Sequence, residues 1–117
     1  MNDAKPSEIP VVFYRTAGGV EPVLAWLRSL PPADRRVIGA DLSTLQFGWP
    51  VGMPLCRPLG QGLWEVRSSL PSRRIARLLL FVHGGRIGVV HGFIKKTQKT
   101  PLEDIALARK RMQEMQA

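Results

Sequence analysis

Apolar positions recur with two different periods along the chain, and the change of period predicts the secondary structure. Three runs rich in Val, Ile, Leu and aromatic residues are separated by short turn signals and are typical of an antiparallel meander. These runs are LWEVRSSL (63–70), IARLLLFVH (75–83) and RIGVVHGFI (86–94). Glycine can adopt the positive φ of a two-residue hairpin, so Gly84-Gly85 predicts the turn between the second and third runs. A shorter run, VVFYRT (11–16), predicts a first strand.

Helical spacing predicts two helices before the meander. Apolar residues recur at i, i+3, i+4 and i+7 over residues 20–27, and Pro31-Pro32 ends this first helix. A second helix begins at about Pro32 and is closed by Gly48 and Pro50. The stretch from Val51 to Gly62 is punctuated by proline and glycine, which predicts no regular element there.

One more helix is predicted after the meander. Thr100 as the cap, Pro101 at the first helical position and Glu103 three residues after the cap match a capping box. The predicted order is β-α-α-β-β-β-α, a small antiparallel sheet with a helical hairpin and a C-terminal helix, which is the α+β class. Residues 1–117 are expected to form a single domain, with residues 1–9 and 113–117 loosely held.

Charge narrows the choice of partner. The 117 residues carry 17 Lys and Arg against 9 Asp and Glu, a formal net charge of +8 that favours an anionic partner such as nucleic acid. No apolar run approaches the roughly 18 residues of a membrane span, so no membrane partner is expected. The single Cys56 cannot form an internal disulfide, which favours a cytoplasmic location.

Cations gather on one predicted sheet face and at one end of the sheet. Side chains alternate across a strand, so Arg67 and Arg77 fall on the face opposite the helices if the register aligns their strands. Arg77 stands within an otherwise apolar strand, where an unpaired charge would be costly if buried. Four further cations flank the strands, in the turn before the second run and after the third: Arg73, Arg74, Lys95 and Lys96, with Lys99 following. This pattern predicts a surface for a polyanion.

The sequence contains no motif that by itself identifies a catalytic or metal-binding activity. The two histidines have the wrong number and spacing for a zinc site, and no metal or cofactor is expected. His91 is a candidate proton-transfer group, since imidazole titrates near neutrality. If the protein cuts phosphodiesters, arginines and lysines would stabilise the charge on phosphorus during attack by an adjacent 2′-hydroxyl, which exists only in RNA.

Three blocks of sequence resemble toxins of bacterial type II toxin–antitoxin systems. The blocks are FGWPVGMPLCRPLGQGLWEVRSSL, RIARLLLFVHGG and VVHGFIKKTQKTPLEDIALARKR, and the chain looks most like the HigB-like, phage-derived branch of the RelE/ParE superfamily. The resemblance runs from about Val11 to Arg111 and implies a small antiparallel sheet flanked by helices. It also implies ribosome-dependent cleavage of messenger RNA in the ribosomal A site, growth arrest, and neutralisation by a cognate helix-turn-helix antitoxin.

The same resemblance implies roles for individual residues. Arg67, Arg77 and the basic pair Lys95 and Lys96 match strand and post-strand cations of the family, and Arg67, Arg77 and Lys96 are expected to hold the scissile phosphate. From their positions, the cations expected to contact the RNA backbone are Arg73, Arg74, Lys95 and Lys99. On this basis Arg77→Ala is expected to relieve toxicity and leave the fold intact. The RelE branch has a C-terminal tyrosine that acts on the attacking hydroxyl, whereas the one tyrosine of this chain is Tyr14. The general base therefore stays open between His91 and Lys99.

Two other function classes fit the sequence. The ParE branch shares the fold but inhibits DNA gyrase without catalysis, because a fold does not by itself fix an activity. A basic module that binds nucleic acid without cutting it is the second alternative, since no complete acid–base set is present. The basic block FIKKTQKTP favours the endoribonuclease branch.

Overall fold

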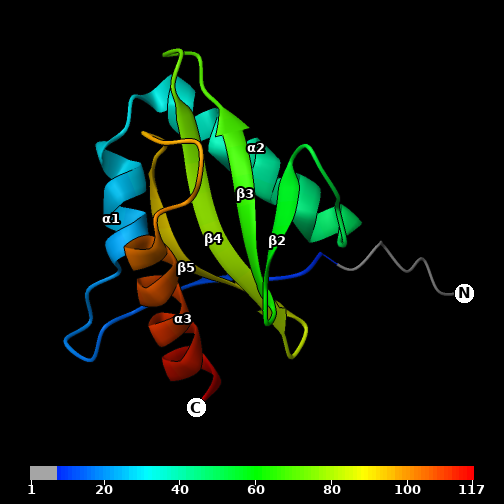
Figure 1. The fold of residues 1–117 in the computed structure, drawn as a ribbon, viewed down its shortest axis with the longest axis vertical. Helices are drawn as coiled ribbons and strands as arrows, with labels where there is room; N and C mark the ends of the chain where they lie inside the picture. Colours follow the sequence, from blue (N-terminus) through cyan, green and yellow to red (C-terminus); the bar gives the residue numbers. More distant parts are fainter. Residues whose placement is uncertain (1–7) are drawn as a thin grey trace, which may run out of the picture.

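The computed structural model describes residues 8–117, which form a five-stranded sheet with three helices (Figure 1). In chain order the elements are β1 (Val11–Phe13), α1 (Pro22–Ser29), α2 (Pro32–Gly48), β2 (Cys56–Gly60), β3 (Leu63–Ser69), β4 (Ile75–His83), β5 (Arg86–Ile94) and α3 (Leu102–Gln116). The predicted α+β class is confirmed. Of the N-terminal residues predicted to be loose, 1–7 lie outside the described residues. The amide of Ile9 donates to the carbonyl oxygen of Gln46 at 3.0 Å.

The sheet has the strand order β1-β5-β4-β3-β2. Strands β2 to β5 form an antiparallel meander, and β1 joins the far edge parallel to β5. Gly84 and Gly85 have φ values of +58° and +73°, so the hairpin predicted between β4 and β5 is confirmed. The β4–β5 register shifts between Leu79 and Leu80, and this bulge leaves His91 opposite Leu79.

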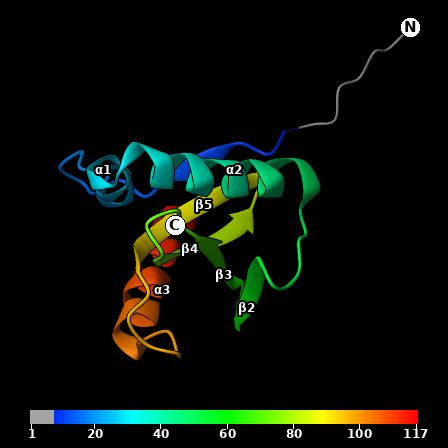
Figure 2. The ribbon, with the colours of Figure 1, turned by 90° about the horizontal axis from the view of Figure 1, so that it is seen from above.

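Helices cover both faces of the sheet, with α1 and α2 on one side and α3 on the other (Figure 2). The even-numbered apolar residues of β4 pack toward α1 and α2: Ala76, Leu78 and Leu80, with Ile38 and Leu45. The odd-numbered apolar residues pack toward α3: Leu79 and Phe81, with Ala108 and Met112. Strand alternation thus sorts the two cores as predicted, but α3 occupies part of the face that was expected to be free of helices.

The prediction of no regular element in residues 51–62 is wrong, because Cys56–Gly60 forms β2. Proline has no amide hydrogen to donate, so it is tolerated on an edge strand, and β2 lies at an edge of the sheet. The β2–β3 register is interrupted between Pro58 and Gly60. Here the pairing with β3 outweighs the local turn signals.

The predicted start and end of the last helix also need correction. Pro101 is the N-cap residue of α3, with no side-chain cap hydrogen bond, and the hydroxyl of Thr100 donates to Glu65 instead. The capping box is therefore not formed, because the Thr100 side chain is directed toward a buried carboxylate and Pro101 stands at the N-cap position. Residues 113–116, predicted to be loose, continue α3, and Met115 packs against the apolar cluster beneath it. Within the described residues, no helix has the length and apolar character to cross a membrane.

Candidate nucleic-acid interface

The strand register brings Arg67 and Arg77 together. Arg67 of β3 lies directly opposite Arg77 of β4, and Arg77 lies opposite Phe93 of β5. A neighbouring row joins Arg57 of β2 to Glu65 of β3. Residues directly opposite each other on antiparallel strands have Cβ atoms about 5 Å apart, so four polar groups from three strands share the α3 face of the sheet.

Arg77 and Glu65 are closed off from solvent. Their side chains are 1% and 0% exposed, and the Arg77 Nε lies 3.6 Å from the Glu65 Oε1. Burial lowers the pKa of Arg77, Glu65 opposes that effect, and the charges of Arg67 and Arg57 reinforce it. A single carboxylate therefore compensates a cluster of three guanidinium groups.

The buried pair also anchors the segment between β5 and α3. The Arg77 Nη2 donates to the carbonyl oxygen of Gln98 at 2.7 Å, and the hydroxyl of Thr100 donates to Glu65. Within residues 8–117, the Nε and Nη1 atoms of Arg77 have no hydrogen-bond partner. Arg77 thus holds the covering segment in this conformation and does not face solvent.

A basic hollow of about 390 Å³ lies where β4 begins and β5 ends. We use "basic hollow" for the site lined by Arg73, Arg74, Ile75, Lys95, Lys96, Thr97 and Gln98. The Lys95 amide donates to the Ile75 carbonyl oxygen at 2.7 Å, which joins the two strand ends that carry these cations. Arg73 has a φ of +65° in the turn that enters β4. Backbone pairing across the strand ends therefore gathers cations that are far apart in sequence.

The cations of the basic hollow differ in their freedom. The Arg74 Nη2 lies 3.3 Å from the Asp34 Oδ2, and its Nε donates to the hydroxyl of Ser72 at 3.1 Å. Among the described residues, no ion pair is formed by Arg73, Lys95 or Lys96. Three cations are thus available to an incoming anion, while Arg74 is held in place.

His91 is paired with a carboxylate from α3. Its Nε2 donates to the Asp104 Oδ1 at 2.7 Å, and the two side chains are 16% and 23% exposed. The ring of Phe93 lies with its centroid 5.2 Å from that of His91. A carboxylate on one ring nitrogen fixes the imidazole tautomer and leaves Nδ1 as the proton acceptor. Lys99, the other candidate base, is exposed and does not line the basic hollow.

The predicted site residues therefore fall into three groups: the basic hollow, Arg77 with Arg67 opposite it, and His91 with its partner Asp104. Gln98 links two of them, since it lines the basic hollow and accepts the hydrogen bond from Arg77. His91 and Asp104 lie on the other side of Phe93, toward the first turn of α3. Arg67 is partly exposed beside Arg77 and does not line the basic hollow.

Sequence reasoning missed three residues that complete this arrangement. Glu65 compensates the arginine cluster, Arg57 extends it, and Asp104 orients His91. The one signal in the sequence was Glu65, a lone acid within the meander. The pairing of Asp104 depends on how α3 docks, which no local pattern specifies. The described residues contain no group of three or more His, Cys, Asp or Glu side chains that could hold a metal ion.

Comparison with known families gives one match, which spans most of the chain. A family model described as Phage derived protein Gp49-like (DUF891) matches residues 25–113, a span that includes the arginine cluster, the basic hollow and the His91–Asp104 pair. A comparison with curated proteins gave no significant match.

Proposed function

Since the chain belongs to the family of phage-derived Gp49-like proteins, which are toxins of the RelE/HigB type, we propose that it cleaves messenger RNA on the ribosome. In this proposal it is the HigB-like toxin of a type II toxin–antitoxin system and acts in the cytoplasm. Its reaction is attack of the RNA 2′-hydroxyl on the adjacent phosphorus, without a metal ion.

The observation that carries the proposal is the basic hollow. Arg73, Lys95 and Lys96 line it, and the described residues offer none of them an ion pair. Cations without a protein partner are suited to phosphate groups, and preorganised cations stabilise the extra negative charge of a pentavalent phosphorus. In the proposal Lys96 contacts the scissile phosphate. Arg67, which lies opposite Arg77 on the adjacent strand β3, assists it. Arg73, Arg74, Lys95 and Lys99 contact the flanking backbone.

The remaining roles follow from the two side-chain pairs. His91 takes the proton of the attacking 2′-hydroxyl at Nδ1, while Asp104 holds Nε2 and stabilises the imidazolium that forms. The new P–O2′ bond forms as the P–O5′ bond breaks, and the leaving O5′ takes up a proton from water. The products are a 2′,3′-cyclic phosphate and a 5′-hydroxyl. Arg77 acts through the Gln98 carbonyl oxygen, holding the segment that presents Lys95 and Lys96.

Primer extension on messenger RNA from cells that express the protein tests this function. New 5′ ends within codons, carrying hydroxyl groups, are expected for the wild type. Lys96→Ala is expected to reduce cleavage by about a hundredfold or more, as for loss of one transition-state donor. Lys110→Ala is the matched control, since Lys110 is an exposed lysine of α3 outside the basic hollow.

Three outcomes would contradict the proposal or one of its residue roles. Growth arrest with intact transcripts and DNA damage signalling would favour gyrase inhibition. Binding of RNA with neither cleavage nor growth arrest would favour a non-enzymatic basic module. Equal cleavage by Lys96→Ala and the wild type would remove Lys96 from the reaction.

A further inference from the structure

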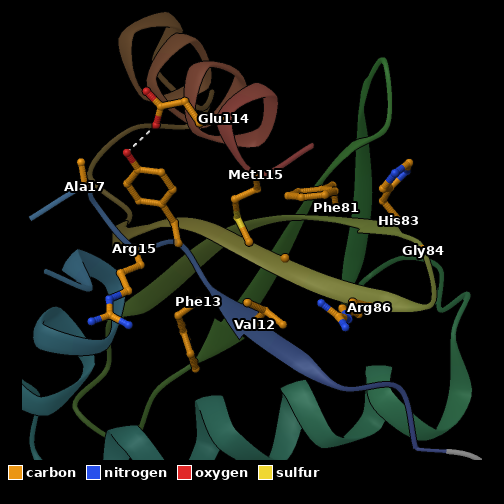
Figure 3. Close-up of a pocket in the computed structure, with 12 residues that line it drawn as sticks. Val12, Phe13, Arg15, Ala17, Phe81, His83, Gly84, Arg86, Glu114 and Met115 are labelled. Carbon is orange, nitrogen blue, oxygen red and sulfur yellow. Dashed lines mark hydrogen bonds between the residues drawn. The ribbon is translucent and has the colours of Figure 1, made fainter. Parts of the chain in front are cut away.

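A second and larger hollow, of about 590 Å³, lies on the α3 side of the sheet (Figure 3). It is bounded by the last turn of α3, by β1 with the residues that follow it, and by the hairpin between β4 and β5. We call it the α3 groove. It lies at the His83 end of β4, whereas the basic hollow lies at the Ile75 end of the same nine-residue strand. The two sites are therefore separate.

The bottom of the α3 groove is apolar. The side chains of Phe81 and Met115 point into it from β4 and α3 (Figure 3). Gly88 lies opposite both Phe81 and Val12 in the sheet, and a Cβ atom at Gly88 would come within 2.4 Å of the Phe81 ring. The aromatic ring thus lies over a residue with no side chain, and Val12 beside it is 37% exposed.

The edges of the α3 groove are basic. Arg15 and Arg86 lie at opposite ends of the groove, and His83 lies beside the hairpin (Figure 3). Among the described residues that line the groove, Glu114 is the one acid, and its carboxylate accepts the hydroxyl of Tyr14. The contact between Tyr14 and Glu114 does not involve the two arginines. The described residues give neither Arg15 nor Arg86 an ion pair.

We propose that the α3 groove binds an acidic amphipathic segment of the cognate antitoxin, an inference that rests on the proposed function for the existence of that partner. Apolar side chains of the segment would cover Phe81 and Met115, and its carboxylates would pair with Arg15 and Arg86. A groove with an apolar floor and basic edges suits helix-in-groove recognition of an acidic segment, in which apolar anchors give affinity and rim charges give specificity.

Two other occupants fit the α3 groove less well. A second copy of this chain would bring another net charge of +8 against a basic rim. RNA needs an open aromatic face for a base, but the Arg111 guanidinium lies 4.9 Å from the Tyr14 ring centroid, and Glu114 repels phosphate. The acidic segment satisfies both the apolar floor and the charged edges.

The test uses the product of the reading frame adjacent to this gene as the probe. Complex formation with the full chain is measured by isothermal titration calorimetry. Arg15→Glu/Arg86→Glu, a charge reversal at two exposed positions, is expected to weaken binding at least a hundredfold. Arg35→Glu/Arg36→Glu is the matched control on the exposed face of α2 and is expected to bind like the wild type. Met115→Asp provides an independent change of the apolar floor and is also expected to weaken binding.

The proposal is overturned if the groove variants bind the adjacent product like the wild type. It is also overturned if Lys95→Glu/Lys96→Glu in the basic hollow abolishes binding and the groove variants keep it. It is also overturned if the adjacent product does not bind the wild-type chain. A separate growth assay without the adjacent product distinguishes failure of the proposed function from failure of the groove proposal. Groove variants are expected to arrest growth and to escape neutralisation, whereas a wild-type chain that does not arrest growth would argue against the toxin assignment alone.

Discussion

At the scale of single residues, two charged groups of the α3 face, Arg77 and Glu65, have been taken out of water. Arg77 and Glu65 are nearly fully buried, and each holds part of the segment that follows β5. Removal of one partner from a buried pair leaves an uncompensated charge, whereas replacement of both by apolar residues of similar size is close to neutral. The stability of this site therefore depends on the pair and not on either residue alone.

Arg77→Ala is expected to lower the free energy of unfolding by about 3–5 kcal/mol, because it removes the buried guanidinium beside Glu65 and leaves that carboxylate to pair with the more exposed Arg57. The double variant Glu65→Leu/Arg77→Met is expected to recover most of that loss, as measured by urea denaturation. The sequence-based expectation was that Arg77→Ala leaves the fold intact, and the burial of Arg77 leads us to predict this loss of stability instead. A loss below about 1 kcal/mol in the single variant would show that Glu65 finds sufficient compensation elsewhere.

Gly88 gives a second prediction at this scale. Gly88→Ala is expected to destabilise the protein by about 1–3 kcal/mol, since its Cβ would meet the Phe81 ring at 2.4 Å. Gly39→Ala is the control: Gly39 lies within α2 with no atom within 4 Å of its added Cβ, so the change is expected to stabilise by up to about 1 kcal/mol. Thermal unfolding of both variants tests the contrast. Equal shifts would mean that the Phe81 ring moves aside at little cost.

At the scale of elements, strand ends and helix starts are joined by polar contacts. Asp34, in the first turn of α2, accepts the Ser72 amide at 3.2 Å and the Arg74 guanidinium at 3.3 Å. These contacts fix the turn that enters β4, which contributes Arg73 and Arg74 to the basic hollow. The position of α2 on one face is thereby coupled to a cation site at the end of the sheet.

This contact makes stability depend on pH. Burial raises the pKa of Asp34, but hydrogen bonds from Ser72 and the charge of Arg74 outweigh that effect, so the net pKa lies below its ordinary value of 3.8. A carboxyl group with a lowered pKa in the folded state stabilises the protein when ionised, and this stabilisation is lost as pH falls through the folded-state pKa. The urea concentration at the midpoint of unfolding of the wild type is therefore expected to decrease as the pH is lowered below about 4.

Asp34→Asn is expected to unfold more readily at pH 7 and to lose less stability on acidification than the wild type. Glu103→Gln, at an exposed carboxylate in the first turn of α3, is the control and is expected to follow the wild-type pH profile. Identical profiles for all three proteins would assign the acid sensitivity to other carboxyl groups.

At the scale of the whole molecule, cations that contribute to the net charge of +8 lie in two separate places. One set of cations lines the basic hollow, and another lines the ends of the α3 groove. A phosphate backbone and an acidic protein segment could therefore occupy different ends of β4. In the two proposals above, the catalytic surface and the partner surface are therefore distinct.

Salt dependence tests the RNA contacts of the proposed function. Each lysine that neutralises a phosphate of single-stranded RNA contributes about 0.7 to the slope of log affinity against log salt concentration. Lys96→Ala is expected to reduce the slope by about that amount, and Lys110→Ala is expected to leave it unchanged, as measured by fluorescence anisotropy with a labelled oligonucleotide. An unchanged slope for Lys96→Ala would remove Lys96 from the RNA contacts.

Most of the secondary structure could be predicted from the sequence, because it depends on local patterns. The runs at 75–83 and 86–94 coincide with β4 and β5, and Pro31-Pro32 separates α1 from α2. Strand alternation also predicted that Arg67 and Arg77 share a face. Two local patterns failed where a tertiary contact was stronger: β2 forms by pairing with β3, and Thr100 binds Glu65 in place of capping α3.

The sequence by itself determined the α+β class, the excess of cations and the strand positions of Arg67, Arg77 and His91. Only the tertiary structure decided that Arg77 is buried, that Asp104 pairs with His91 and that Lys95 and Lys96 meet Arg73 at one hollow. The physical reason is that periodicity and turn chemistry act over a few residues. Burial, ion pairing and cavities depend on the register of strands and the docking of α3, which join residues distant in sequence.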